Sequence, residues 1–165
     1  MIIGFCEKDD MRLEGKSLDW EYQVKVNGKS GDGSSWYSRN FFKTIDAALA
    51  FSCGKAGGAV EVKQVLAECR KVKTQLLRAV AAKGVREADV LVDVGRGYRI
   101  VGSGLDWRVE GNPVHYFTSF ENAVEHVYES CLRALEVKLG NCQELAGECR
   151  SLKSSIVKTI EDSGL

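Results

Sequence analysis

"DMRLEGKSLDW" (10–20) and "GYRIVGSGLDW" (97–107) lie in gapless register, and each residue of the second segment follows its counterpart by 87 positions. Both segments end in Leu-Asp-Trp, so that Trp107 stands where Trp20 stands in the first segment. A match of this length and position suggests that one unit is used twice. Two further pairs of segments support this interpretation.

The match extends into the segments that follow. "FFKTIDAALAF" (41–51) parallels "YFTSFENAVEH" (116–126) at a displacement of 75, and "VLAECRKVKTQLLRAV" (65–80) parallels "LAGECRSLKSSIVKTI" (145–160) at 80. In the last pair, apolar residues keep the same helical face in both copies. These residues are Val65, Cys69, Val72, Leu76 and Val80, matched by Leu145, Cys149, Leu152, Ile156 and Ile160.

The changes in displacement show where the copies differ. The fall from 87 to 75 places twelve extra residues in copy one, and "NGKSGDGSS" (27–35) has the Gly, Ser and Asp content of a hairpin loop. The rise to 80 places five extra residues in the helical half of copy two. We therefore expect repeat unit 1 at 1–83, a linker at 84–89 and repeat unit 2 at 90–165.

Each copy begins with short alternating segments separated by polar or glycine turns, which predicts an antiparallel meander. The expected strands are "IIGFC" (2–6), "MRLEG" (11–15), "WEYQVKV" (20–26), "SWYSRNFF" (35–42), "VLVDV" (90–94), "YRIVG" (98–102), "WRVEG" (107–111) and "VHYFT" (114–118). Thr44 and Ser119 then provide capping hydroxyls, and a helical period follows each of them. The sequence therefore predicts an α+β fold, with each meander followed by a long amphipathic helix.

The helical halves differ in continuity. In copy two, apolar residues at steps of three and four run from Phe120 to Ile160, which predicts one very long helix or two stacked end to end, with a weaker break at 140–141. In copy one the pattern loses phase at "GKAGGA" (54–59), where three glycines predict a break or kink. We expect the two copies to be related by a pseudo-twofold axis with their helices packed together, coiled-coil-like. A homodimer that buries the same faces between chains is the alternative.

Composition limits the class of protein. Lys plus Arg and Asp plus Glu are 23 each, a balance that argues against a partner recognised mainly through its phosphates. No apolar run approaches the roughly 20 residues that span a bilayer, and "MIIGF" (1–5) lacks the basic start of a signal peptide. The six cysteines form no Cys-x-x-Cys pair and are expected to be reduced thiols. These features predict a cytoplasmic protein that does not enter a membrane.

No motif indicates catalysis, a cofactor or a metal. The two histidines, His115 and His126, are scattered, and Cys131 lies five positions from His126, off its helical face. Cys69 and Cys149 recur at equivalent apolar positions, as small core residues do. The glycines of 54–59 lack the order of a phosphate-binding loop. We therefore expect no catalytic residues, no cofactor and no metal ligands.

The asymmetric addition to copy one is the candidate contact region. "SSWYSRNFFK" (34–43) interleaves aromatic and basic residues on an expected strand, beside the inserted loop. The predicted partner-binding residues are Trp36, Tyr37, Arg39, Lys29 and Asp32. The alternative is nucleic-acid binding, in which bases stack on the same aromatic rings. Trp20 and Trp107 are expected to pack against their sheets, the alternative being an exposed pair.

The segment "YRIVGSGLDWRVEGNPVHYFTSFENAVEHV" (98–127) resembles small uncharacterised phage and prophage proteins, which join a short meander to a capped helix. The resemblance covers about a third of the chain and rests on pattern, not on a specific motif. It implies an accessory protein that inhibits or redirects a host protein complex, such as a defence complex, by masking its surface. It assigns no functional residue.

Overall fold

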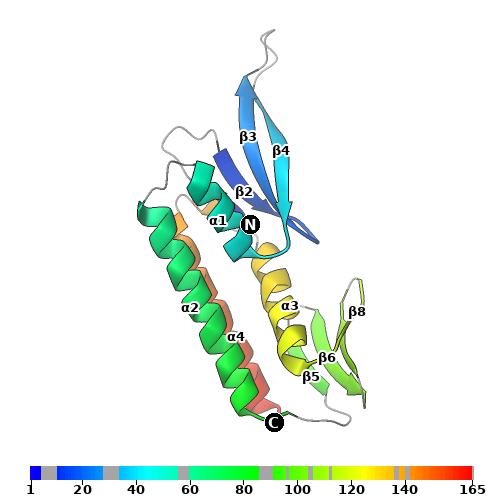
Figure 1. The fold of residues 1–165 in the computed structure, drawn as a ribbon. Helices are drawn as coiled ribbons and strands as arrows, with labels where there is room; N and C mark the ends of the chain where they lie inside the picture. The colour runs from blue at the N-terminus through cyan, green and yellow to red at the C-terminus, as the bar shows by residue number, and fades with distance from the viewer. Residues whose placement is uncertain are drawn as a thin grey trace. The chain divides into compact units, whose positions relative to one another are not determined.

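The computed structural model describes residues 1–4, 11–27, 34–55, 60–85, 91–95, 97–103, 106–111, 113–135, 138–139 and 142–164. Helices and antiparallel sheets occupy separate parts of the chain, which confirms the predicted α+β class (Figure 1). The order of elements, four strands and then two helices, occurs twice, and one additional short strand lies between the last two helices.

The chain divides into two compact units, and neither unit is continuous in sequence. Unit 1 holds Met1–Arg70 and Leu132–Glu148, and unit 2 holds Lys71–Cys131 and Cys149–Leu165. The boundaries predicted from the repeats, 1–83, 84–89 and 90–165, stay a prediction, as do the tandem duplication and its pseudo-twofold axis. Most of the expected linker, 86–89, lies outside the described residues.

The sheet of unit 1 is a four-stranded meander with one added strand. β1 (Ile2–Gly4), β2 (Met11–Gly15), β3 (Trp20–Asn27) and β4 (Ser34–Phe42) pair antiparallel in chain order. β9 (Lys138–Leu139) pairs with β1 in parallel, so the order is β4-β3-β2-β1-β9. β4 is therefore an edge strand of this sheet.

One face of this sheet is covered by helix α1 (Ile45–Lys55). The ring centroid of Phe51 lies 5.2 Å from those of Tyr22 and Phe42, which joins the helix to β3 and β4. Thr44 caps the helix, because its Oγ1 accepts a hydrogen bond from the Ala47 amide at 3.4 Å. This contact confirms the predicted start of the helix.

Unit 2 holds a four-stranded sheet with a helix packed on it. β5 (Leu91–Gly95), β6 (Tyr98–Ser103), β7 (Asp106–Glu110) and β8 (His115–Phe117) form a second antiparallel meander in chain order. Helix α3 (Phe120–Arg133) follows, and its residues up to Cys131 belong to unit 2. The rings of Trp107 and Phe120 lie 4.8 Å apart, which joins this helix to its sheet.

The two meanders have the same register. Gly15 pairs with Trp20 between β2 and β3, and Gly102 pairs with Trp107 between β6 and β7. Both tryptophans are buried, as predicted, and each glycine is closely approached by another part of the protein. At Gly102 a Cβ would lie 3.0 Å from Cζ3 of Trp107, so the tryptophan ring occupies the space that a side chain would need.

The structure shows that the long helix predicted over 120–160 is wrong, and it gives the ends of the helices on either side of the break predicted at 54–59. The apolar pattern of 120–160 does not form one helix or a stacked pair: α3 ends at Arg133, β9 follows, and α4 spans Cys142–Asp162. Leu139 lies in β9, which pairs with β1. The prediction was wrong at this position because the apolar period alone does not distinguish a strand residue from a helix residue. In copy one, α1 ends at Lys55 and α2 spans Val60–Ala82, so most of the predicted break lies outside the described residues.

Within unit 2, α2 and α4 run side by side (Figure 1). Lys153 Nζ of α4 donates a hydrogen bond to Gln75 Oε1 of α2 at 3.3 Å. The predicted apolar face is buried in both helices, through Val72, Leu76 and Val80 of α2 and Cys149, Leu152, Ile156 and Ile160 of α4. This confirms that the helical faces predicted from the repeat are packed.

Candidate interaction surface

The sheet of unit 1 has one face toward its helix and one face away from it. Leu13, Trp20 and Tyr22 are buried on the helix side. Because successive strand residues point to opposite faces, their neighbours lie on the other side, which we call the outer face. The outer face carries Arg12, Glu14, Glu21, Gln23, Lys25, Trp36, Ser38 and Phe41.

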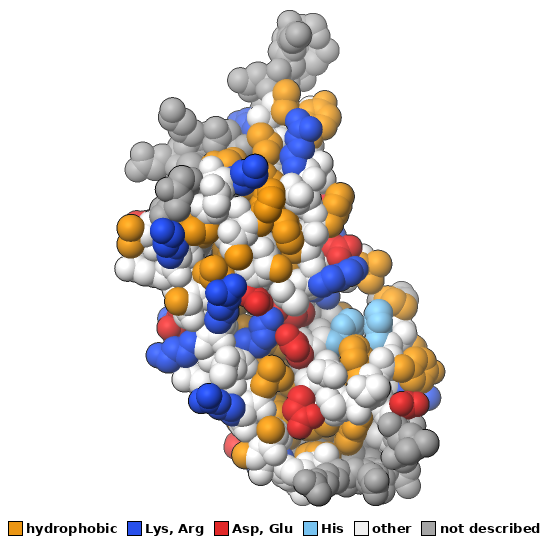
Figure 2. All heavy atoms as spheres, in the orientation of Figure 1, with side chains coloured by type: hydrophobic (Ala, Val, Ile, Leu, Met, Phe, Trp, Pro, Cys, Tyr) orange, Lys and Arg blue, Asp and Glu red, His pale blue; other side chains and the backbone are white. Residues whose placement is uncertain are grey.

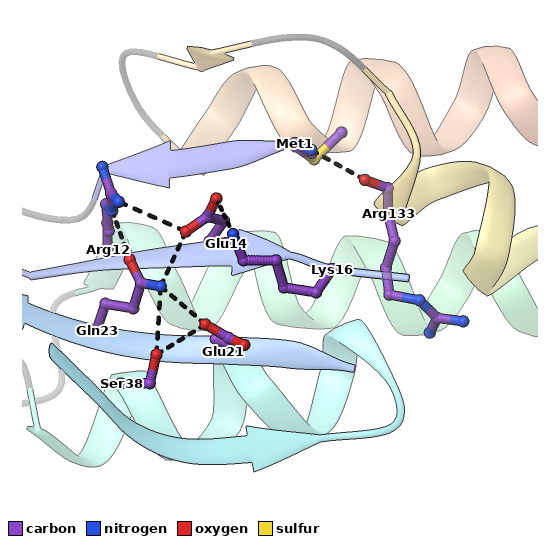
Figure 3. Close-up of polar contacts among 8 residues, drawn as sticks. All are labelled: Met1, Arg12, Glu14, Lys16, Glu21, Gln23, Ser38 and Arg133. Atoms are coloured by element: carbon purple, nitrogen blue, oxygen red, sulfur yellow. Dashed lines mark hydrogen bonds and ion pairs between the residues drawn. The ribbon is translucent and has the colours of Figure 1, made fainter. Parts of the chain in front are cut away.

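Gln23 is the centre of a hydrogen-bond network on the outer face (Figure 3). Its Nε2 donates to Glu14 Oε2 at 2.8 Å and to Glu21 Oε2 at 2.9 Å. Ser38 Oγ also donates to Glu21 Oε2, at 2.7 Å. Gln23 is buried although it lies on the outer face, because these polar side chains cover it. The network thus ties β2, β3 and β4 together through side chains as well as backbone.

Glu14 is the most strongly paired carboxylate of this network. Lys16 Nζ lies 2.6 Å from Glu14 Oε1, and Arg12 Nη2 lies 3.4 Å from Oε2. Burial alone would raise the pKa of Glu14, but hydrogen bonds from Lys16 and Gln23 and the charges of Lys16 and Arg12 lower it overall. Glu14 is therefore held as a carboxylate and neutralises part of the positive charge around it.

The same network fixes Arg12 beneath Trp36. Arg12 Nε donates to Gln23 Oε1 at 2.8 Å, and Arg12 Cζ lies 4.2 Å from the centroid of the Trp36 ring. This distance is that of a cation–π contact, which orders both side chains. Trp36 is half-buried as a result. One face of its ring is occupied by a group of the protein itself.

The other predicted contact residues lie at different places on β4. Tyr37 pairs with Val24 and points to the face opposite Trp36, and it is exposed. Arg39 lies at a β-bulge, since Tyr22 pairs with Asn40 whereas the next residue of β3 pairs with Ser38. The structure therefore distributes the predicted residues over both faces and the edge of one strand. Lys29 and Asp32 lie outside the described residues.

Sequence reasoning missed an exposed aromatic and a histidine pair. Phe41 is 61% exposed on the outer face, although it was not among the residues predicted to bind a partner. In unit 2 the rings of His115 and His126 lie 4.3 Å apart, and Figure 2 shows the two pale blue side chains together at the surface. Only the packing of β8 against α3 brings them together, so their separation in sequence gave no signal.

Possible metal ligands and cysteine thiols were searched for among the residues that the structure describes. In the described ranges, no group of three or more His, Cys, Asp or Glu residues is placed to hold a metal ion. The four cysteines described with their burial, Cys53, Cys69, Cys131 and Cys149, are all buried.

Comparisons with known proteins do not add a relative. No family model matches the chain, and neither curated proteins nor solved structures give a match. Among the described residues, no helix combines the length and the apolar character needed to cross a membrane.

Proposed function

We propose that this protein is a non-enzymatic interaction module that binds a partner protein through β4. The observation that supports this is an edge strand with exposed aromatic side chains: Tyr37 is 53% exposed and Phe41 is 61% exposed. Edge strands offer unpaired backbone groups to a partner strand, and aromatic and arginine side chains are enriched among binding hot spots. The Gln23 network gives this strand a rigid support.

Protein is favoured over nucleic acid as the partner because of charge. Glu14 and Glu21 lie on the same outer face as Arg12. Glu14 accepts a hydrogen bond from Arg12 Nη2 and Glu21 accepts one from Gln23 Nε2, so the face is not a positive surface for phosphates. One face of the Trp36 ring is also covered by Arg12 and is closed to a base. The more specific form of the proposal, masking of a host complex by a phage protein, is supported by the sequence resemblance alone.

A paired-variant capture experiment tests the proposal. The double variant Tyr37→Ser, Phe41→Ser removes both exposed rings of β4, whereas Val60→Ser removes a 68% exposed apolar side chain from α2 and is the matched control. We expect nuclease-treated native lysate to yield a protein that binds the wild type and the control but not the double variant. Equal capture by all three forms, or loss of the captured protein on nuclease treatment, would contradict the proposal.

A salt titration then separates the two classes of partner. Phosphate contacts lose affinity steeply as salt rises, whereas apolar contacts do not. We expect the affinity for the captured protein to change little between low and physiological salt. A steep fall would favour the nucleic-acid alternative.

A further inference from the structure

Two histidine rings of unit 2 lie together at the surface, although they come from different elements. His115 belongs to β8 and His126 to α3, and their ring centroids are 4.3 Å apart with the planes tilted by 50°. Both side chains are partly exposed, and Figure 2 shows them side by side. Two imidazoles at this distance can share one ligand.

Regular structure holds both rings in place. His115 pairs with buried Val109 and Phe117 pairs with buried Trp107, so His115 and Phe117 point to the helix side of the sheet. The Phe117 ring lies 5.0 Å from the ring of His126 and packs against it. The two histidines are therefore presented by a paired strand and a helix, and not by a loop.

The matching place in unit 1 has similar ring packing without an imidazole. Phe51 stands where unit 2 has His126, and its ring lies 5.2 Å from that of Phe42 at a tilt of 43°. The matching pair in unit 2, Phe117 and His126, lies 5.0 Å apart at a tilt of 41°. A phenyl ring thus serves for packing at this position, and packing alone does not account for the histidine.

The spacing of the two imidazoles fits two ligands on one metal ion. A ligating imidazole nitrogen lies about 2.0–2.1 Å from the metal, which puts the ring centroid about 3.2 Å from it. Two such rings at a right angle would have centroids about 4.5 Å apart, whereas tetrahedral ligands would need about 5.2 Å. The observed 4.3 Å is close to the right-angle value, which is typical of tetragonal Cu²⁺ and Ni²⁺.

We propose that His115 and His126 bind a divalent transition-metal ion of the Ni²⁺ and Cu²⁺ class, through one nitrogen of each ring. The second nitrogen of each ring can keep a hydrogen bond within the protein, which orients a ligating imidazole. Because both side chains are partly exposed, water fills the remaining coordination positions. The proposal does not rest on the proposed function, since it concerns unit 2 and needs no partner protein.

Nickel titration followed by NMR tests the proposal on the whole chain. The chain has two histidines, so its imidazole signals come from His115 and His126 alone. We expect paramagnetic Ni²⁺ to broaden both sets of signals and to saturate at one ion per chain, and Mg²⁺, which prefers oxygen ligands, to leave them unchanged. Because protons compete for the same nitrogens, the affinity should fall from about pH 7.5 to about pH 5.5. Sharp signals from either histidine at saturating Ni²⁺, or equal broadening by Mg²⁺, would overturn the proposal.

Substitutions taken from unit 1 serve as matched variants. His126→Phe introduces the ring that Phe51 has in unit 1, and His115→Asn introduces the residue that unit 1 has there, Asn40. We expect each variant to lower the Ni²⁺ affinity measured by calorimetry at least about tenfold, since losing a ligand costs no less than losing a group that orients it. Wild-type affinity in either variant would overturn the proposal, because other side chains would then hold the ion. If a variant does not fold, the histidine signals of the wild-type protein decide the question. Capture through β4 is unaffected by either result, so the two proposals fail separately.

Discussion

The meanders of unit 1 and unit 2 match on their buried faces and differ on their outer faces. Leu13 and Ile100 occupy equivalent positions, both are buried, and each pairs with a buried residue of the next strand, Tyr22 and Val109. On the outer faces, Glu14 of unit 1 stands where unit 2 has Val101. The comparison teaches that the inward residues determine register, because a slip of one residue would turn the apolar set toward water. The outer faces are then open to different interactions.

A second difference lies where equivalent lysines meet different neighbours. Lys73 of α2 is buried, and its Nζ lies 3.0 Å from Glu129 Oε1 and 3.3 Å from Glu125 Oε1 of α3. Lys153, its counterpart in α4, donates a hydrogen bond to the uncharged Gln75 and is partly exposed. The same position is thus a buried ion pair in one helix and a surface contact in the other.

The largest expected effect comes from removing Lys73. Lys73→Met leaves Glu129 buried without this cation, and breaking a buried pair in this way costs about 3–5 kcal/mol. Lys153→Met, the matched control, should change the free energy of unfolding by less than about 0.5 kcal/mol, as surface substitutions do. Urea unfolding measures both values.

A second substitution sharpens this test. Adding Glu129→Gln to Lys73→Met removes the buried negative charge and should recover part of the lost stability. If Lys73→Met and Lys153→Met are equally stable, the buried ion pair of Lys73 contributes no more to stability than the surface contact of Lys153, and the expected difference between α2 and α4 is wrong.

The next effect concerns the two equivalent glycines. A Cβ at Gly15 would lie 2.9 Å from the backbone Cα of Arg133, and a Cβ at Gly102 would lie 3.0 Å from the Trp107 ring. We expect Gly15→Ala to cost about 2–3 kcal/mol and Gly102→Ala about 1–2 kcal/mol, because backbone yields less than a side chain and overpacking costs about 1–3 kcal/mol. Thermal unfolding compares the two variants. A larger loss for Gly102→Ala would show that the buried ring is the more rigid neighbour.

Much of the fold was predictable because it depends on local pattern. Alternation and turn residues located all eight meander strands, and the caps at Thr44 and Ser119 located the starts of α1 and α3. β9 was missed, since two residues carry no period and its pairing with β1 is non-local. The outer-face network around Gln23 was also missed. It depends on which polar side chains of three strands meet, and alternation alone does not specify their partners.

The smallest expected effect is a pH dependence that arises from Glu14 of unit 1. The pKa of Glu14 is lowered from 4.5 in the folded protein, so its carboxylate stabilises the fold fully above pH 4.5 and loses this contribution as the pH falls through its lower folded value. Glu14→Gln should remove that part of the acid-induced loss, which we expect to be no more than about 1 kcal/mol for a partly exposed pair. Val101→Gln, at the equivalent position of unit 2, should leave the pH dependence unchanged because no carboxylate is removed. Urea unfolding at pH 7 and at pH 3.5 measures the difference. If Glu14→Gln lowers stability equally at both values, then Glu14 acts through its hydrogen bonds alone, and the charge difference between the two outer faces has no effect on folding.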